Sequence, residues 1–389
     1  MTHLKKILMF NFTRENTGII AKWWRGVDKE ILFLFTLLFL LGLFFSFSST
    51  SSVAAEKMNK ETYFFFLKHL IFVLISLFLL LIISIQDKNK IIKLITLLFI
   101  ISVLLLIFVP IFGVEVKGSK RWIDLIILPI FQPIELVKPF FILFVAKIIV
   151  LNNNIKIYNR YLFSFFALIF IVILLINQPD LGQTLLLIAT WITMLFAAGF
   201  NMVFLSILVF LFFIFALLLL FFLPTKFGYV FSRIQTFFNP ERGDNFQSEK
   251  ALDAIKQGGL TGQGMGEGIL KDRVPEAHTD YIIAVISEEF GALFVLFIVI
   301  LFLFIGYRVL NKVFLEKNEF IKLTLIGLVS LLIIQTLIHV GVNVRLLPTT
   351  GMTLPFLSYG GSSLIGSSII AGIILNFTRK EFTSYFEND

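Results

Sequence analysis

Residues 31–48, ILFLFTLLFLLGLFFSFS, decide the class of this protein, because this uncharged apolar run is long enough to cross a bilayer as one helix. Nine further apolar runs follow along the chain. The pattern predicts an all-α fold, that of a polytopic membrane protein with about ten transmembrane helices. The predicted spans are 31–48, 63–85, 91–112, 134–151, 161–177, 182–199, 201–223, 281–307, 321–343 and 357–377.

The composition of the whole 389-residue chain supports this class. Hydrophobic residues make up 58% and charged residues 15%, whereas about a quarter of the residues in a soluble domain are charged. A soluble fold of this size could not bury so much apolar surface. Cysteine is absent, which excludes disulfides, thiolate metal sites and cysteine nucleophiles. The net charge of +8 is interpreted as a topology signal, and no nucleic-acid partner is expected.

The distribution of Lys and Arg predicts the side on which each end lies. The two terminal segments and the connections after the second, fourth and eighth runs hold 17 cations, against six in the short loops of the other side. Both termini are therefore predicted to be cytoplasmic, and no cleavable signal peptide is expected. We expect a cytoplasmic segment 1–30, one transmembrane domain 31–377 and a cytoplasmic tail 378–389, with a large extracytoplasmic loop 224–280 between spans seven and eight.

The long loop contains a glycine-rich stretch, residues 258–268, GGLTGQGMGEG. Glycine at this density lets backbone amides approach an anion closely, and a tight turning loop is the alternative. No Gly-Lys-Ser/Thr sequence follows, and no strand context surrounds the stretch. Neither a Walker A loop nor a dinucleotide-binding fingerprint therefore fits.

Residues 275–281, PEAHTDY, place three titratable groups where the polar loop meets an apolar span. A carboxylate at such a boundary is partly desolvated, which makes it a better base, so Asp280 is the predicted general base. A solvated helix N-terminus is the alternative. A metal pair formed by His278 and Asp280 fits poorly, because a spacing of two puts the side chains on different helix faces.

Three further features carry charge or irregular backbone into the apolar regions. Glu135 and Lys138 stand three residues apart on one helix face, either as a cavity pair or as a structural pair. Residues 348–363, PTTGMTLPFLSYGGSS, are predicted to form a re-entrant cavity wall. Glu288 and Glu289 lie roughly 12–14 Å beyond Asp280 along a helix, so they are candidate intramembrane carboxylates of a transport pathway.

These blocks occur in the same order as those of a known family. Together with Arg121-Trp122, QPIE at 132–135 and QPDLG at 178–182, the chain resembles the SEDS family of polytopic peptidoglycan glycosyltransferases over nearly its whole length. Residues 343–349, NVRLLPT, and 351–355, GMTLP, look more like the cell-division branch of that family than its elongation branch. The chain departs from the family pattern at three positions, none of them a charged site residue: Ile134, Pro139 and Gln183.

The resemblance implies polymerisation of lipid II, an undecaprenyl-diphosphate-linked disaccharide peptide, on the outer face of the bacterial cytoplasmic (inner) membrane at the division septum. It implies a class B penicillin-binding protein transpeptidase and other divisome membrane proteins as partners. It assigns catalysis to Asp280 and matches further polar site positions at Arg121, Trp122, Glu135, Lys138, Asp180, Arg233, Lys271, Glu276, His278, Thr279 and Ser358.

The chemistry of such a reaction fits these residue types. One carboxylate base would activate a sugar hydroxyl, and cations, with a divalent Mg²⁺ or Mn²⁺ ion as the expected cofactor, would stabilise a diphosphate leaving group. A lipid II flippase, an elongation polymerase of the same family and a scaffold that recruits a transpeptidase are the alternatives. Dense outward motifs with a sparse cytoplasmic face favour chemistry on one side over alternating access.

Overall fold

The computed structural model describes residues 18–49, 64–116, 119–124, 130–151, 156–222, 224–238 and 246–380. Parts of the predicted terminal segments and of the predicted long loop, namely residues 1–17, 381–389 and 239–245, lie outside the described residues.

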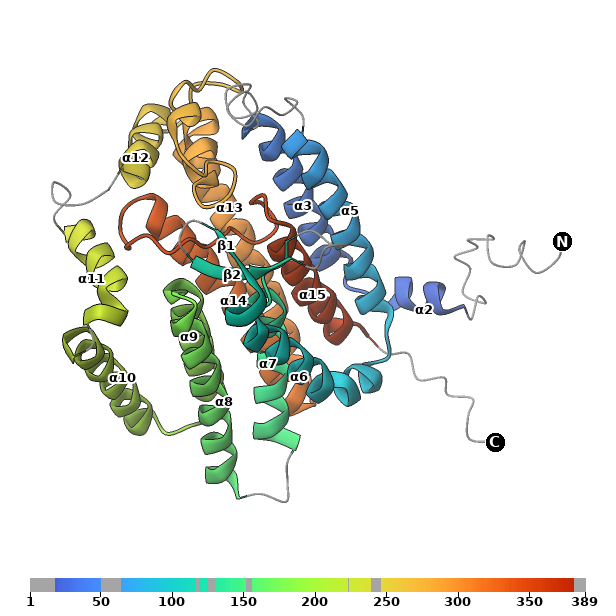
Figure 1. Cartoon of the computed structure of the whole chain (residues 1–389). Helices are drawn as coiled ribbons and strands as arrows, with labels where there is room; N and C mark the ends of the chain where they lie inside the picture. Colours follow the sequence, from blue (N-terminus) through green and yellow to red (C-terminus); the bar gives the residue numbers. More distant parts are fainter. Residues whose placement is uncertain are drawn as a thin grey trace.

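Helices dominate these ranges and follow the predicted apolar runs (Figure 1). Along the chain they are α2 (Ile19–Gly26), α3 (Lys29–Ser49), α5 (Phe64–Ile85), α6 (Lys88–Phe112), α7 (Ile134–Leu151), α8 (Ile157–Asn177), α9 (Leu181–Ala197), α10 (Met202–Phe222), α11 (Pro224–Phe238), α12 (Phe246–Gly258), α13 (Ile282–Leu315), α14 (Glu319–Asn343) and α15 (Gly361–Thr378). Within the described ranges, each predicted span overlaps one long helix.

Seven of these helices, α3, α5, α6, α8, α13, α14 and α15, are long and apolar enough to cross a membrane by length and composition. Among the others, α7 carries three charged side chains and α9 has 17 residues. The prediction of a mostly helical multi-pass membrane fold is confirmed. The count of ten spans stays a prediction.

Both described ends of the chain meet on one side of the bundle. The backbone N of Lys380, just after α15, donates a hydrogen bond of 3.0 Å to the carbonyl of Gly26 at the end of α2. Arg379 continues this contact by donating to the carbonyls of Ser84 and Ile85, both at 3.2 Å. The two ends therefore lie on the same side, as an even number of crossings requires.

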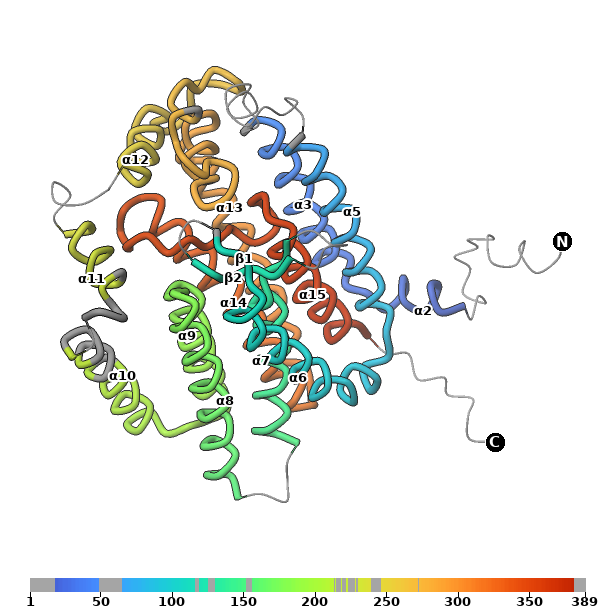
Figure 2. The backbone as a smooth tube through the Cα atoms, in the orientation of Figure 1, coloured from blue at the N-terminus to red at the C-terminus, as the bar shows by residue number. Residues whose placement is uncertain are grey.

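The centre of the bundle is α15, most of which is buried, whereas α10 and α11 lie at one side (Figure 2). Glycines allow α15 to approach its neighbours closely. A Cβ added to Gly361 would collide with the ring of Phe72, and one added to Gly372 would stand 3.0 Å from the carbonyl oxygen of Leu80. The segment 348–360, which contains both polar and apolar residues, lies between α14 and this helix.

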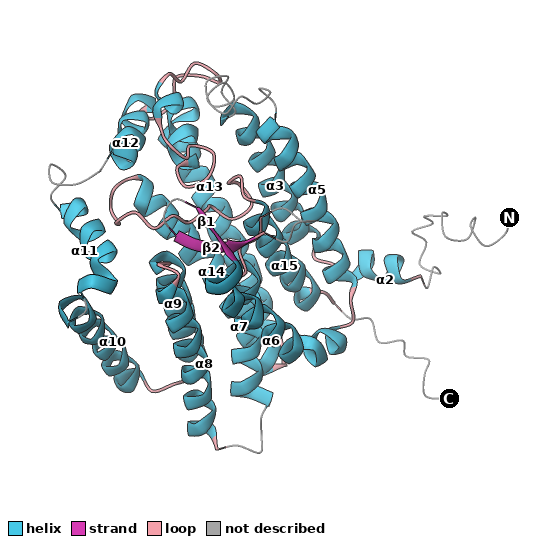
Figure 3. Cartoon of the chain, in the orientation of Figure 1, coloured by secondary structure: helices cyan, strands magenta, loops and turns pink. Residues whose placement is uncertain are grey.

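A small sheet departs from the expectation of an entirely helical fold (Figure 3). Strands β1 (Gly113–Val116) and β2 (Ser119–Ile123) form an antiparallel hairpin in the connection between α6 and α7. Strands of four and five residues are too short to show a clear period in the sequence. The hairpin matters because β2 carries Arg121 into the interior, whereas Trp122 is half-buried.

The region between α10 and α13 is helical over much of its described length. α12 buries Ala251, Ala254 and Gly258, which recur at helical spacing, and it packs against α13. A Cβ added to Gly258 would collide with the Ser287 carbonyl, and one added to Gly262 with the Glu289 carbonyl. The glycine-rich stretch thus serves close packing on the first part of α13.

Helix α13 is broken at Gly291, whose φ of 82° and ψ of 170° are not helical. The glycine-rich stretch lies against this break, since the backbone N of Ala292 donates to the Gly259 carbonyl at 2.9 Å. A side chain at Gly291 would collide with the Leu260 carbonyl. The first part of α13 is therefore a short separate helix that follows Asp280.

Candidate active site

The segment before α13 is held by its backbone. The carbonyls of residues 278–280 each accept a hydrogen bond from another element of the fold. The donors are the backbone N of Tyr359, the Oγ of Ser358 and the Nδ2 of Asn343, at 2.8, 2.7 and 3.1 Å respectively. These three bonds fix the position of Asp280 and confirm that the segment 348–363 forms a wall of the site.

Asp280 lines a small pocket with a volume of about 110 Å³. The pocket lies where α11, α12, α14, the start of α13 and the segment 348–363 meet. Ligand sites that enclose whole small molecules measure about 300–1,000 Å³, so this pocket is large enough for only part of such a molecule. Its described lining residues are Arg233, Gln247, Asp280, Tyr281, His339, Val342, Thr349, Thr350, Gly351 and Met352.

Two arginines bring positive charge to this carboxylate. Arg233 lines the pocket and donates a hydrogen bond of 3.0 Å to the carbonyl of Thr349. Gly351, with a φ of +68°, stands between Asp280 and Arg121. A Cβ on Gly351 would be 3.6 Å from Asp280 Oδ2 and 3.8 Å from Arg121 Nη1. A carboxylate and two guanidinium groups therefore lie close to Gly351 and the Thr349 carbonyl.

The turn between α8 and α9 holds the guanidinium group of Arg121. Its Nε donates to the Gln178 carbonyl at 3.1 Å, its Nη2 donates to the Pro179 carbonyl, and its Nη1 lies 3.9 Å from Asp180 Oδ1. Burial raises the pKa of the Asp180 carboxyl above its ordinary value, and the Arg121 guanidinium opposes that rise. Asp180 thus helps to hold Arg121 and lies away from the lining of the pocket.

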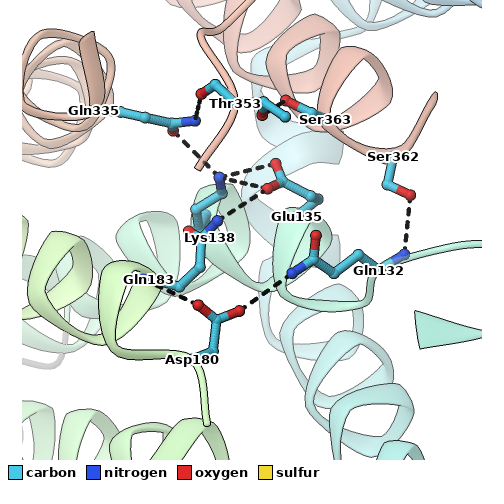
Figure 4. Close-up of polar contacts among 9 residues, drawn as sticks. All are labelled: Gln132, Glu135, Lys138, Asp180, Gln183, Gln335, Thr353, Ser362 and Ser363. Atoms are coloured by element: carbon cyan, nitrogen blue, oxygen red, sulfur yellow. Dashed lines mark hydrogen bonds and ion pairs between the residues drawn. The ribbon is translucent and has the colours of Figure 1, made fainter. Parts of the chain in front are cut away.

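Glu135 and Lys138 form a buried ion pair on one face of α7, as the sequence predicts (Figure 4). The Nζ of Lys138 is 2.9 and 2.8 Å from the two carboxylate oxygens of Glu135 and 3.3 Å from Gln335 Oε1. Gln183 Nε2 donates to Glu135 Oε1 at 3.3 Å. Neither member of the pair is among the described residues that line the Asp280 pocket.

The pair is nevertheless connected to the wall of the site (Figure 4). Gln335 Nε2 donates to the Thr353 carbonyl at 2.9 Å, and Thr353 Oγ1 donates to Ser363 Oγ at 2.7 Å. A continuous set of hydrogen bonds therefore links α7, α14, the segment 348–363 and α15. Such a network fixes one arrangement of these elements, because Lys138, Gln335 and Thr353 each have a partner in it.

The structure corrects the expectations for Glu288, Glu289 and the glycine-rich stretch. The amides of Leu270 and Lys271 donate to the two oxygens of Glu288 at 2.7 and 2.6 Å, and Gly266 N donates to Glu289 Oε1 at 3.2 Å. The anions that the glycine-rich stretch and the residues after it approach are therefore the carboxylates of Glu288 and Glu289. Both carboxylates are fully buried.

Lys271 belongs to this acidic cluster and does not line the pocket. Its Nζ forms an ion pair with Glu289, and the Oγ of Ser48 donates to the other oxygen of that carboxylate. Ser48 is in the last turn of α3, at the end opposite the chain termini. Glu289 therefore lies near the same end of the bundle as Ser48. The break at Gly291 ends the first part of α13 at this point. A transport pathway through these carboxylates loses its support.

Five other predicted residues, His278, Thr279, Glu276, Trp122 and Ser358, are not among those that line the pocket. The ring of His278 lies between Phe65 and Tyr359, with centroid distances of 5.2 and 5.6 Å. Thr279 Oγ1 donates to Glu276 Oε2 at 2.9 Å. Trp122 pairs with Val114 across the hairpin, and Ser358 is buried as a backbone anchor. Of the predicted residues, only Asp280 and Arg233 line the pocket, with Arg121 beside it.

Sequence reasoning missed three residues of α14 that join this site. Gln335, His339 and Asn343 are each buried and stand four residues apart, on one face of the helix. His339 lines the pocket, Asn343 holds the Asp280 backbone, and Gln335 contacts Lys138. The signal was present, since polar residues at this spacing in an apolar span mark an interior face.

The pocket offers one carboxylate to a metal ion. Within the described residues, no three His, Asp or Glu side chains cluster closely enough to hold a metal. Mg²⁺ is commonly bound by one or two carboxylates together with substrate phosphates. Asp280 fits that mode of binding, and a site formed by the protein alone does not fit the described residues.

Comparisons with known proteins show the family to which the chain belongs. Residues 28–382 match the sequence model of the cell cycle protein family of FtsW, RodA and SpoVE. A probable peptidoglycan glycosyltransferase FtsW from Caulobacter vibrioides is 33% identical over 376 residues, covering 96% of this chain and 95% of the relative. A protein of the same description from Trichlorobacter lovleyi is 34% identical over 374 residues, covering 92% and 96%.

Solved structures share the fold. A chain from a peptidoglycan synthase complex, described as coordinating polymerization and crosslinking, superposes with a TM-score of 0.71 at 25% identity, covering 90% of this chain and 97% of that chain. The rod shape determining protein RodA of Thermus thermophilus superposes with a TM-score of 0.67 at 24% identity, covering 91% and 97%. At that identity, the second likeness concerns the fold alone.

Proposed function

This chain belongs to the FtsW, RodA and SpoVE family of cell cycle proteins, and on that premise we propose that the Asp280 pocket is its catalytic site. The chain is a peptidoglycan glycosyltransferase of the FtsW type, as are the relatives that match over nearly its whole length. The observation that carries the site assignment is the carboxylate of Asp280 with Arg121 and Arg233 beside it.

The proposed reaction is a single displacement at a sugar carbon. Asp280 accepts the proton of an acceptor hydroxyl, whose oxygen forms a bond to the anomeric carbon of the donor sugar. The bond between that carbon and the diphosphate oxygen breaks, and the diphosphate leaves with the electron pair. Arg121 and Arg233 stabilise the negative charge that develops on this leaving group. One displacement inverts the configuration at the anomeric carbon.

The substrate we propose is lipid II, which serves as donor and as the source of acceptor units. A lipid-linked sugar presents its diphosphate at the membrane surface, and the Asp280 pocket lies beside the ends of spans on the predicted outer side. Because the pocket holds only about 110 Å³, the acceptor sugar enters it by one edge. The remaining sugars, the peptide and the lipid lie outside the pocket.

The protein is a multi-pass membrane protein, and we place it in the bacterial cytoplasmic membrane at the division septum. The FtsW relatives support the septal role. A fold neighbour comes from a complex that combines polymerization with crosslinking. That supports a class B penicillin-binding protein as a partner, together with other divisome membrane proteins.

We also propose that a divalent ion, Mg²⁺ or Mn²⁺, assists the leaving group. Asp280 is the residue that would hold it, together with diphosphate oxygens, and the ion would supply positive charge. Removing divalent ions with a chelator should then slow polymerisation, and adding back Mg²⁺ or Mn²⁺ should restore it. Equal rates in the presence and absence of chelator would contradict a role for the ion.

The decisive experiment uses the purified protein in liposomes with labelled lipid II, with and without a class B penicillin-binding protein. Growth of glycan chains by wild type, and its loss in Asp280→Asn, supports the proposal. Movement of lipid II across the bilayer without chain growth would indicate a flippase. Neither activity, together with stimulation of the transpeptidase, would indicate a scaffold.

A further inference from the structure

His339 enters the Asp280 pocket from α14, and nothing in the proposed reaction uses it yet. The side chain is 1% exposed and is one of the residues that line the pocket. A histidine in an apolar helix is costly unless its ring nitrogens find partners. What the two nitrogens contact therefore decides what the residue does.

One ring nitrogen is held by the wall of the site. His339 Nδ1 lies 2.7 Å from the carbonyl oxygen of Met352. A carbonyl oxygen can only accept, so Nδ1 must carry the hydrogen. In the neutral ring, the other nitrogen, Nε2, then presents a lone pair and acts as an acceptor. The fold thus selects both the orientation of the ring and its tautomer.

The second nitrogen has no protein partner. Among the described residues, His339 Nε2 has no hydrogen-bond partner, although this atom is buried. An acceptor left unsatisfied costs about 1–3 kcal/mol, so it is a good contact for a ligand that brings a donor. The pocket around it also contains Asp280 and Arg233.

We propose that His339 Nε2 accepts a hydrogen bond from a hydroxyl of the acceptor sugar and so turns that sugar toward Asp280. The inference rests on the proposed function and adds a substrate-binding residue to it. A sugar edge supplies hydroxyl donors at short spacing, and a pocket of this size admits only such an edge. Asp280 takes the proton of the reacting hydroxyl, while His339 holds a neighbouring hydroxyl without becoming charged.

Two substitutions separate the two ring nitrogens. The amide of Asn reaches the position of Nδ1, so His339→Asn keeps a donor for the Met352 carbonyl and removes the acceptor at Nε2. The longer Gln side chain brings an amide oxygen to the position of Nε2, so His339→Gln restores the acceptor. His69→Asn is the matched control, because His69 in α5 is also fully buried, makes no hydrogen bond among the described residues and does not line the pocket.

The measurement is the apparent KM and kcat for lipid II polymerisation in liposomes with the partner transpeptidase present. His339→Asn should raise KM about five- to tenfold, as the loss of one hydrogen bond implies, and change kcat by less than about threefold. His339→Gln should recover most of the affinity, and His69→Asn should keep the wild-type KM. Thermal unfolding of each variant checks that the proteins are folded.

Three outcomes would overturn the inference: a wild-type KM in His339→Asn, a fall in kcat alone, or equal defects in the Asn and Gln variants. A wild-type protein that fails to polymerise would instead contradict the proposed function. Binding of labelled lipid II to the same variants keeps the two failures apart. Weaker binding in His339→Asn than in His339→Gln would still support the contact with a sugar hydroxyl.

Discussion

Asp280 and the pair Glu288 and Glu289 lie within nine residues of one another, at the start of the same helix, and yet they have opposite surroundings. Asp280 is held by its backbone carbonyl, and its side chain lines a pocket with Arg233. Glu288 and Glu289 are fully buried, and backbone amides and Lys271 surround their oxygens. The comparison shows that carboxylates near the start of one helix can differ in their surroundings: Asp280 lines a pocket, whereas donors of the protein enclose Glu288 and Glu289.

The largest effect that would test this comparison is the loss of the base. Asp280→Asn keeps the shape of the side chain and removes its basicity, so polymerisation should fall by about 10²–10⁴ while the unfolding temperature stays unchanged. Asp253→Asn on α12, at a half-exposed carboxylate, is the control. Activity of Asp280→Asn within about threefold of wild type would end the assignment of a general base.

Changes in the cluster of Glu288, Glu289 and Lys271 should lower the stability of the fold. Lys271→Met leaves Glu289 buried without its cation, which should cost about 3–5 kcal/mol in the free energy of unfolding. Lys250→Met, which breaks a largely exposed ion pair with Asp253, should cost less than about 1 kcal/mol. Denaturation in detergent gives both values. If Lys271→Met abolished lipid II use without a change in stability, Lys271 would bind substrate as the resemblance implies.

The pair on α7 offers an intermediate case, because it lies near the site without lining the pocket. Lys138→Met should destabilise the fold by about 2–4 kcal/mol, and the double variant with Glu135→Gln should recover part of that loss, since no charge is left unpaired. Unfolding and polymerisation are measured for all three variants. A double variant that is stable and yet inactive would show that the charges bind substrate.

The smallest effect tests the opening between the base and Arg121. Gly351→Ala and Gly266→Ala both place a Cβ at a positive φ, which should cost each variant about 1–2 kcal/mol of stability. At Gly266 the added carbon meets open space, whereas at Gly351 it lies beside Asp280 and Arg121. Only Gly351→Ala should lose activity, by about tenfold, because its methyl group would occupy space between Asp280 and Arg121 and shift the bound substrate. Equal activities of the two variants would show that the reaction does not take place between Asp280 and Arg121.

Several features of the site could be predicted from the sequence and several could not. The segments 275–281 and 348–363 were recognisable because polar, Gly and Pro residues interrupt apolar runs there. His339 and Asn343 were missed although their spacing in α14 marks an interior face. Lys271 was assigned to the substrate because the family resemblance implies it. Its contact with Glu289, and that of Glu289 with Ser48 far away in the chain, had no local signal.

The sequence by itself determined the helical membrane fold, the order of the spans and the segment that carries Asp280. Hydropathy adds up over consecutive residues, so a run of about 20 apolar residues reveals itself without knowledge of its neighbours. Only the tertiary structure decided which polar groups are satisfied by the protein and which are left for a ligand. Hydrogen bonds and ion pairs act over about 3 Å, and packing joins residues that are hundreds of positions apart. The chain pairs Lys271 with Glu289, and it places Asp280 and His339, whose Nε2 has no hydrogen-bond partner among the described residues, in the lining of one pocket.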